Sequence, residues 1–314
     1  MKNGVFRKAL IEARRMDADF SLGQGSGDAE RAKRMHQDDE MEFIRDSAAG
    51  RERIFMAKLS VLILAKNEEK NIADCIRSVS FADEVVVLDD FSTDRTVAIA
   101  EGLGARVVQR ALDGNWGAQQ TFGIGQTRYE WLFMIDADER ASKRLAAKVR
   151  EIVVADDRRY AYLNARLNYF WEHPLRHGGW FPDYVVRLLP REGTHVEGLV
   201  HQAIRHTYEE VRLPKDCYMI HYPYRSWEHY FSKFNVYTTL AAEKLREKGK
   251  RASLSNILLH PAWASFRMYI LRGGWRDGRI GLFLAGFHFF YTMAKYVKLY
   301  YLDKKNEHVG DESW

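Results

Sequence analysis

Short apolar runs alternate with helix-patterned segments between residues 59 and 154 of this 314-residue chain. Such uninterrupted runs are typical of strands buried on both faces of a sheet. The pattern predicts strands at residues 59–65, 84–88, 106–109 and 131–135, with helices at 72–79, from a cap at Ser92 or Thr93 to near Gly102, at 115–126 and at 142–154. Because strand and helix alternate at short spacing, we expect an α/β fold with a mostly parallel sheet flanked by helices on both faces.

The chain changes character on either side of this region. Residues 1–57 carry many charges of both signs and few β-branched residues, which predicts a disordered tail. Met56 directly precedes the first strong strand, so we expect it to be the natural start. Residues 58–250 are predicted to form the main domain, and residues 251–314 a helical, aromatic and basic extension that is amphipathic.

The second half of the main domain is less regular. Residues 160–171, 184–189 and 195–204 alternate as strands do, and residues 227–246 have strong helical periodicity. These segments are separated by loops rich in glycine, histidine and aromatic residues. We therefore expect additional strands followed by a long helix.

Composition excludes several classes of protein. A 46% hydrophobic and 29% charged chain is typical of globular domains. Cys75 and Cys217 lie far apart without a CxxC pattern, which argues against a disulfide scaffold or a cysteine zinc site and favours a reducing compartment. No secretory signal is recognisable. A net charge of +5 is too mild to indicate a nucleic-acid partner. Together these features predict a cytoplasmic globular protein.

Polar clusters follow three of the predicted strands, at residues 65–68, 89–94 and 136–139. Ligands of open parallel sheets bind beyond the carboxyl ends of the strands. Each cluster alone could be a helix cap or a turn. Since all three would meet at one edge, they predict a ligand site.

Asp136 and Asp138, separated by one residue after a buried strand, are the most informative pair. Their carboxylates suit Mg²⁺ or Mn²⁺, and Mg²⁺ commonly shares its site with substrate phosphates. The expected ligand is a nucleoside diphosphate. The alternative is a salt-bridged turn with Glu139 and Arg140 as surface partners. Neither G-x-G-x-x-G after the first strand nor G-x-x-x-x-G-K-[ST] occurs, which disfavours dinucleotide oxidoreductases and P-loop NTPases.

The first-half motifs at residues 59–68, 89–94 and 135–139 resemble family 2 glycosyltransferases, which have the GT-A fold. Second-half motifs resemble the bacterial lipopolysaccharide core glucosyltransferase subgroup (WaaE/KdtX-like); they lie at residues 178–184, 187–189, 200–201 and 221–225. The resemblance covers residues 58–302. It implies inverting, metal-dependent transfer of a hexose from a nucleotide sugar, first of all a UDP-sugar, to a hydroxyl of a glycolipid or lipopolysaccharide core.

The resemblance also implies roles for individual residues. Those implied to bind the nucleotide are Ala65, Asn67, Glu68, Asp89, Asp90, Gln120 and Asp136. Asp90 would accept a hydrogen bond from the N3–H of the base. Asp138 would be the main ligand of Mg²⁺ or Mn²⁺, with Asp136 facing both ribose and metal. His221 is a candidate third ligand, and a buried core histidine is the alternative.

Inversion requires a carboxylate that acts as general base on the acceptor hydroxyl. Asp183 is the first candidate and Glu197 the second; a turn residue after Pro182 is the alternative for Asp183. Arg225 and Lys233 are candidates to hold the diphosphate or an anionic acceptor, or else are exposed charges.

The chain departs from the subgroup at two places. Gln120-Thr121 stands where the subgroup has Arg-Asn, which implies a changed nucleotide contact and leaves room for a different donor. His201-Gln202 stands where it has His-Glu, which removes one candidate acid.

Residues 280–294 are apolar apart from a break at His288, with tryptophan, tyrosine and basic residues nearby. This composition predicts helices lying in a membrane interface, and hence a peripheral protein on the cytoplasmic face of the inner membrane. The alternative is an aromatic core helix packed on the catalytic domain.

Three other functions remain open from the sequence. A transferase that loads sugar onto a polyprenyl phosphate would need no hydroxyl base. A nucleotidyltransferase shares strand-end carboxylates and Mg²⁺ but typically carries a glycine-rich phosphate loop that this chain lacks. A catalytically silent binding module would tolerate loss of Asp138.

Overall fold

The computed structural model describes residues 44–45, 52–53, 56–198, 203–224 and 226–308. The chain divides into a unit of residues 1–56 and a unit of residues 57–314. In the first unit, β1 (Ile44–Arg45) pairs antiparallel with β2 (Glu52–Arg53). Apart from residues 56 and 57, the rest of the tail predicted to be disordered lies outside the described residues.

The second unit begins with a parallel sheet of four strands. Its strands are β3 (Leu59–Ala65), β4 (Glu84–Asp89), β5 (Arg106–Gln109) and β6 (Trp131–Asp136), in the order β5-β4-β3-β6. Every pairing among them is parallel, as predicted. Leu62 and Ile63 point to opposite faces and are both fully buried, so the central strand is covered on both sides.

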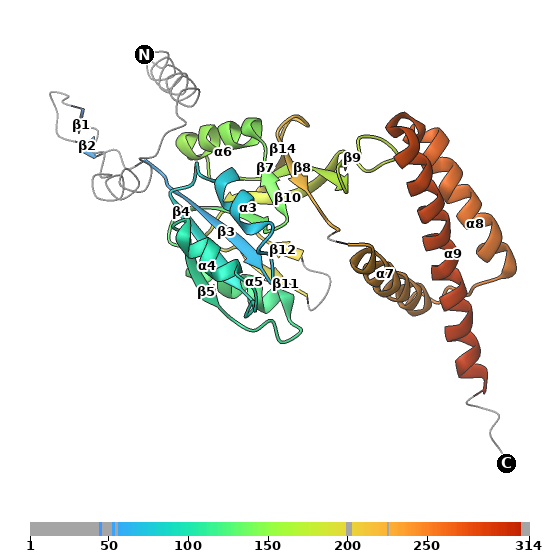
Figure 1. Ribbon diagram of the computed structural model, residues 1–314. Helices are drawn as coiled ribbons and strands as arrows, with labels where there is room; N and C mark the ends of the chain where they lie inside the picture. Colours follow the sequence, from blue (N-terminus) through green and yellow to red (C-terminus); the bar gives the residue numbers. More distant parts are fainter. Residues whose placement is uncertain (1–43, 46–51, 54–55, 199–202, 225, 309–314) are drawn as a thin grey trace. The chain divides into compact units, whose positions relative to one another are not determined.

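Four helices cover the two faces of this sheet (Figure 1). They are α3 (Ile72–Ser78), α4 (Thr96–Gly102), α5 (Trp116–Gln126) and α6 (Lys143–Ala155). The caps Asn115 and Ser142 accept hydrogen bonds from Ala118 and Leu145 N–H groups. Ile72 and Val149 pack in one core cluster, while Ile124 packs in another with Leu62.

The predicted cap of α4 is wrong. The helix begins at Thr96, and its N-cap, Arg95, makes no side-chain capping bond. Asp94 Oδ1 accepts from the Thr96 N–H group at 3.0 Å instead. Ser92 and Thr93 precede the N-cap position, and their hydroxyl groups donate to Asp89 and Asn67 instead.

The sheet continues as β6-β10-β8-β14-β7, in which every pairing except that of β8 with β14 is antiparallel. The added strands are β7 (Glu139–Ala141), β8 (Tyr160–Phe170), β9 (His173–Pro174), β10 (Asp183–Pro190), β13 (Glu209–Arg212) and β14 (Tyr218–His221). β10 runs antiparallel to both β6 and β8, whereas β13 and β14 are parallel to β8. The whole is a mixed α/β fold with a largely parallel sheet, as predicted.

The segment expected as one strand at residues 195–204 is instead two. β11 (His195–Glu197) pairs antiparallel with β12 (Ala203–Arg205), apart from the main sheet. Gly198, with φ +102°, directly follows β11 in a conformation that side-chain-bearing residues rarely adopt, so the extended run stops there.

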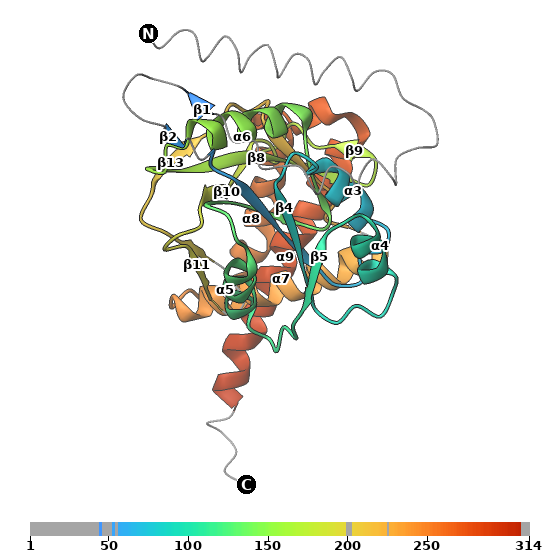
Figure 2. The ribbon, with the colours of Figure 1, turned by 90° about the vertical axis from the view of Figure 1, so that its left-hand side faces the viewer.

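The unit ends in helices that lie beside the α/β region (Figure 1 and, turned by 90°, Figure 2). They are α7 (Trp227–Glu247), α8 (Leu254–Phe266), the π-helix η1 (Arg267–Leu271), the 3₁₀-helix η2 (Gly274–Asp277) and α9 (Gly278–His308). α9 packs against both α7 and α8. Phe170 from β8 shares a core cluster with Tyr230, Met268 and Leu284. The predicted helical extension is therefore present.

Candidate active site

The candidate site lies at the carboxyl ends of β3, β4 and β6. The sheet register aligns Ala65 with Asp89 and Leu64 with Asp136. The polar residues that follow these strands therefore meet at one edge of the sheet, where parallel α/β sheets bind ligands.

The turns after β3 and β4 hold each other in place. Asn67 is left-handed at φ 53°, its N–H donates to Ser92 Oγ at 2.8 Å, and its Oδ1 accepts from Thr93 N–H at 2.8 Å. Asp89 is fully buried and accepts from Ser92 N–H at 2.9 Å and Gln109 Nε2 at 3.0 Å. The bonds of Asp89 therefore shape the turn.

Asp90 is nearly buried beside these turns. Its Oδ1 accepts from Leu112 N–H at 2.9 Å, and its Oδ2 pairs with Lys66 Nζ at 2.6 Å. The backbone N–H of Asp90 donates to Ala65 O at 3.0 Å. This carboxylate is thus fixed in orientation at the end of β4.

A partly buried charge cluster lies where β6 turns into β7. Arg187 Nη2 is 2.7 Å from Asp136 Oδ2 and 2.9 Å from Glu139 Oε2. Burial disfavours both carboxylates, but Arg187 holds the pKa of Asp136 below its usual value, while the pKa of Glu139 is raised by burial. Glu139 is fully buried, so the alternative in which it is a surface partner is wrong. Within the turn at residues 136–139, the Glu139 carboxylate accepts a hydrogen bond from the Asp136 N–H at 3.0 Å.

A β-bulge aims Arg187 at this cluster. The register of β10 on β8 shifts between Val186 and Leu188, which leaves Arg187 unpaired in the ladder. On β8, Arg166 links two acids, with Nη1 3.6 Å from Glu139 Oε1 and Nη2 2.6 Å from Asp183 Oδ2. The first candidate base is therefore connected to the cluster through Arg166.

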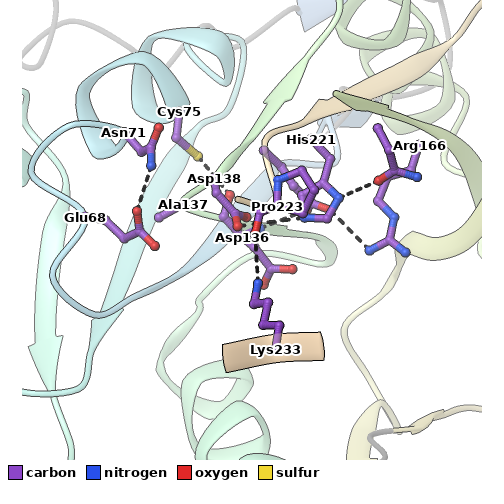
Figure 3. Close-up of polar contacts among 12 residues, drawn as sticks. Glu68, Asn71, Cys75, Asp136, Ala137, Asp138, Arg166, His221, Pro223 and Lys233 are labelled. Atoms are coloured by element: carbon purple, nitrogen blue, oxygen red, sulfur yellow. Dashed lines mark hydrogen bonds and ion pairs between the residues drawn. The ribbon is translucent and has the colours of Figure 1, made fainter. Parts of the chain in front are cut away.

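Three side chains from different elements approach one another next to the cluster (Figure 3). Asp138 Oδ2, in the turn after β6, is 3.8 Å from His221 Nε2 at the end of β14. His221 Nδ1 is 2.6 Å from Asn168 Oδ1. When Nδ1 carries the ring proton and donates it to that amide oxygen, Nε2 presents its lone pair toward Asp138. Lys233, from α7, donates to Pro223 O at 2.9 Å.

The local charges set the protonation of these groups. Burial, Asp136, Glu139 and Glu68 raise the pKa of Asp138 to about 8. Burial and the charge of Arg166 lower the pKa of His221 to about 3. The site thus contains a neutral imidazole and a carboxyl group whose charged form is disfavoured, because too little positive charge lies near it.

This donor set fits a hard divalent cation. Among the described residues, no three His, Cys, Asp or Glu side chains are grouped to hold a metal ion. Mg²⁺ is usually bound by one or two carboxylates together with waters and substrate phosphates. Asp138 and His221 suit that arrangement, because a cation would relieve the surplus negative charge around Asp138.

The remaining predicted residues lie elsewhere. Glu197 on β11 is 56% exposed and pairs with Arg205 at 2.8 Å, which lowers its pKa. No contact links it to the charge cluster within the part of the chain described. Gln120 is buried on α5. Arg225 and the His201-Gln202 departure lie outside the described residues.

Sequence reasoning assigned no role to Arg166. It considered Glu139 only as a surface partner in the alternative, and it noted Arg187 only within a motif. Their importance depends on pairing across β8 and β10, which no local pattern encodes. The motif at residues 187–189 was the one available signal.

Comparison with known proteins agrees with this geometry. Residues 60–204 match Glycosyl transferase family 2. The chain is 30% identical over 257 residues to an uncharacterized glycosyltransferase of Rickettsia felis, covering 76% of this chain and 89% of that protein. The chain belongs to glycosyl transferase family 2. The predicted family is thus confirmed, and the chain is a glycosyltransferase with a GT-A-like fold rather than a nucleotidyltransferase or a silent module.

Two further similarities were found, one to a protein sequence and one to a crystal structure. The chain is 28% identical over 261 residues to the lipopolysaccharide core biosynthesis glycosyltransferase LpsC of Rhizobium meliloti, covering 77% of this chain and 92% of LpsC. A crystal structure of glucosyl-3-phosphoglycerate synthase from Mycobacterium tuberculosis with Mn²⁺, UDP and glucosyl-3-phosphoglycerate matches with a TM-score of 0.31 and 24% identity. That match covers 37% of this chain and 46% of the synthase.

Proposed function

We propose that this glycosyltransferase moves a hexose from a UDP-sugar to a hydroxyl of a lipopolysaccharide-type glycolipid, with inversion and with Mg²⁺ or Mn²⁺ as cofactor. The observation that carries the proposal is the approach of Asp138, His221 and Lys233 beside the strand-end turns. The glycolipid acceptor is suggested by the similarity to LpsC.

On the donor side, the turns after β3 and β4 would hold the nucleoside. Ala65, Asn67 and Glu68 would line the base and ribose, and Asp90 would accept from the N3–H group of uracil. Asp138 and His221 would hold the cation, which when bound neutralises charge on the departing diphosphate. Lys233 would add positive charge at the same place, since its charge already acts on Asp138.

On the acceptor side, Asp183 would act as the base. A bond forms between the acceptor oxygen and the anomeric carbon while the bond from that carbon to the diphosphate breaks. The hydroxyl proton passes to the Asp183 carboxylate. Arg166, 2.6 Å from Asp183 Oδ2, would fix the carboxylate in orientation.

The same ion pair favours a second candidate function. Asp183 Oδ2 accepts two bonds from Arg166, at 2.9 and 2.6 Å, so this carboxylate is committed to a cation. A polyprenyl phosphate acceptor is already an anion and needs no base. Full activity of an Asp183→Asn variant would favour that acceptor over a hydroxyl.

A glycolipid acceptor would be reached at a membrane surface. The C-terminal helices expose large apolar side chains, which we call the apolar face; on α8, η1 and α9 they include Trp263, Phe266, Ile270, Leu282, Phe283 and Phe290. An apolar groove of about 330 Å³ lies between α8–η1 and α9. The same C-terminal segment carries exposed arginines at positions 267, 272, 276 and 279. This combination suits helices lying on an anionic membrane, and we place the enzyme peripherally on the cytoplasmic face of the inner membrane. By length and composition alone, residues 274–302 would also suffice to cross one.

A thermal-shift panel tests the donor and the metal. UDP, UDP-hexoses and other nucleoside diphosphates would be added with and without Mn²⁺ to wild type, Asp138→Ala and, as control, Asp157→Ala. Asp157 is an exposed carboxylate paired with Arg159. We expect a Mn²⁺-dependent rise of about 5–10 °C at a hundred times Kd for a true donor, lost in Asp138→Ala alone. No shift with any uridine or thymidine diphosphate would refute the proposed donor class.

A further inference from the structure

The loop between β9 and β10, residues 175–182, joins the site at both of its ends. At one end, the Leu175 N–H donates to Asn168 O at 2.8 Å, and the Asn168 side chain is the partner of His221. At the other end the loop leads into Asp183, which pairs with Arg166. The position of this loop is therefore coupled to the candidate base and to a candidate metal ligand.

The middle of the loop is held by a segment about a hundred residues further along the chain. His177 N–H donates to Asp277 Oδ2 at 2.9 Å, and His177 Nδ1 lies 2.6 Å from Asp277 Oδ1. The Gly178 N–H donates to Arg272 O at 2.9 Å. The Asp277 side chain is only 9% exposed, so solvent competes little for these bonds.

Close packing makes this attachment rigid. A Cβ at Gly179 would lie 2.6 Å from Arg272 Nη1, and Gly179 has φ +89°, so a side chain would be both crowded and strained. Within the C-terminal turn itself, a Cβ at Gly281 would overlap the Gly274 carbonyl oxygen. The turn formed by η1 and η2 is thus a compact support and presents Asp277 in one place.

We propose that Asp277 is a positioning residue for acceptor transfer. By fixing the β9–β10 loop to the turn between α8 and α9, it sets where Asp183 meets the acceptor. The inference rests on the proposed function, because it assumes that Asp183 faces the acceptor. It also makes the C-terminal helices part of the acceptor side of the enzyme, next to the apolar face.

The test uses Asp277→Asn in the full-length chain. The amide keeps the size of the side chain, but with one acceptor oxygen in place of two it cannot accept from both the His177 N–H and a protonated Nδ1. The acceptor would be glycolipid extracted from cells that lack the gene for this enzyme. With it, we expect kcat/KM for the acceptor to fall about 10- to 100-fold. KM for the UDP-sugar and the Mn²⁺-dependent shift with UDP should not change. Hydrogen exchange at the amides of His177 and Gly178 should accelerate.

Two further variants keep the test decisive. His177→Ala removes the ring but not the backbone donor, so it should give a smaller loss that is not additive with Asp277→Asn; it also carries the test if Asp277→Asn fails to fold. Asp157→Asn, which removes an exposed carboxylate, should behave as wild type.

Several results would overturn the inference. If kcat/KM for the acceptor in Asp277→Asn stays within about twofold of wild type, the inference is wrong. It is also wrong if hydrogen exchange at the His177 and Gly178 amides does not change. Equal losses for donor and acceptor would indicate a general structural role instead. Failure of the proposed function would look different, since wild type itself would then show no UDP-dependent shift.

Discussion

Arg187 places one guanidinium nitrogen 2.7 Å from Asp136 and 2.9 Å from Glu139, inside the fold. The cation is shared by two carboxylates, and its own pKa is raised by them. Asp138, two residues after Asp136, is not among its partners. Asp138 therefore carries negative charge that Arg187 does not directly compensate, and its Oδ2 lies 3.8 Å from His221 Nε2.

Replacing Arg187 by methionine should destabilise the protein strongly. The substitution leaves the fully buried Glu139, and the partly exposed Asp136, without their main cation; for a buried carboxylate such a loss typically costs about 3–5 kcal/mol of unfolding free energy. Urea denaturation of the metal-free protein would measure the loss. Arg159→Met is the matched control, because Arg159 pairs with Asp157 at the surface and should change the midpoint little. Equal midpoints for both variants would contradict the assigned role of Arg187.

The strands in the first half of the fold were predictable because each one has a recognisable pattern in its own residues. Strands β3 and β5 occupy the residues predicted for them, since a strand buried on both faces is a continuous apolar run. Strands β7 and β13 were missed. They are three or four residues long and partly charged, and their pairing partners are distant in sequence. Their existence is determined by the sheet they join.

The site residues, too, could be predicted only where the local sequence indicates them. Asp136 and Asp138 were found because they directly follow an apolar strand. The ion pairs of Arg187 were not predicted, because they depend on a bulge where β10 changes register on β8. The burial of Glu139 depends on the same tertiary contact. The roles of the individual site residues stay predictions.

Asp138→Asn should stabilise the metal-free protein while removing metal-dependent nucleotide binding. At pH 8 the wild-type carboxylate is partly ionised among three other acids, and an amide avoids that repulsion. We expect a gain of roughly 1 kcal/mol or more in unfolding free energy with chelator present. A variant less stable than wild type would show that Asp138 is held by favourable contacts rather than strained for function.

The pH dependence of stability follows from two opposed shifts. Asp138 has a pKa of about 8 in the folded protein against a reference of 3.8, so its contribution is complete below pH 3.8 and is lost as pH rises to 8. His221 has a pKa of about 3 against 6.5, so it disfavours folding at low pH and ceases to matter above 6.5. The two slopes offset each other between pH 4 and 6.5, leaving a decline between 6.5 and 8.

Urea titrations of the metal-free protein at several pH values would measure this decline. Its slope should be at most about 1.4 kcal/mol per pH unit, and Asp138→Asn should remove it. A decline of equal slope in the variant would assign it to other groups.

Removing part of the apolar face should release the protein from membranes without unfolding it. Trp263 and Phe290 are 57% and 55% exposed, so a double Trp263→Ser, Phe290→Ser variant loses little packing inside the protein. If both side chains enter lipid, their loss should weaken binding to phosphatidylglycerol-containing vesicles about 100-fold. Val154→Ser, on α6, is the matched control with 50% exposure and should bind as wild type. Cosedimentation measures the affinity.

Alkaline extraction then separates two modes of attachment, because helices lying in the interface are released whereas a spanning α9 is retained. Retention, or vesicle binding unchanged in the double variant, would contradict a peripheral enzyme docked through this face.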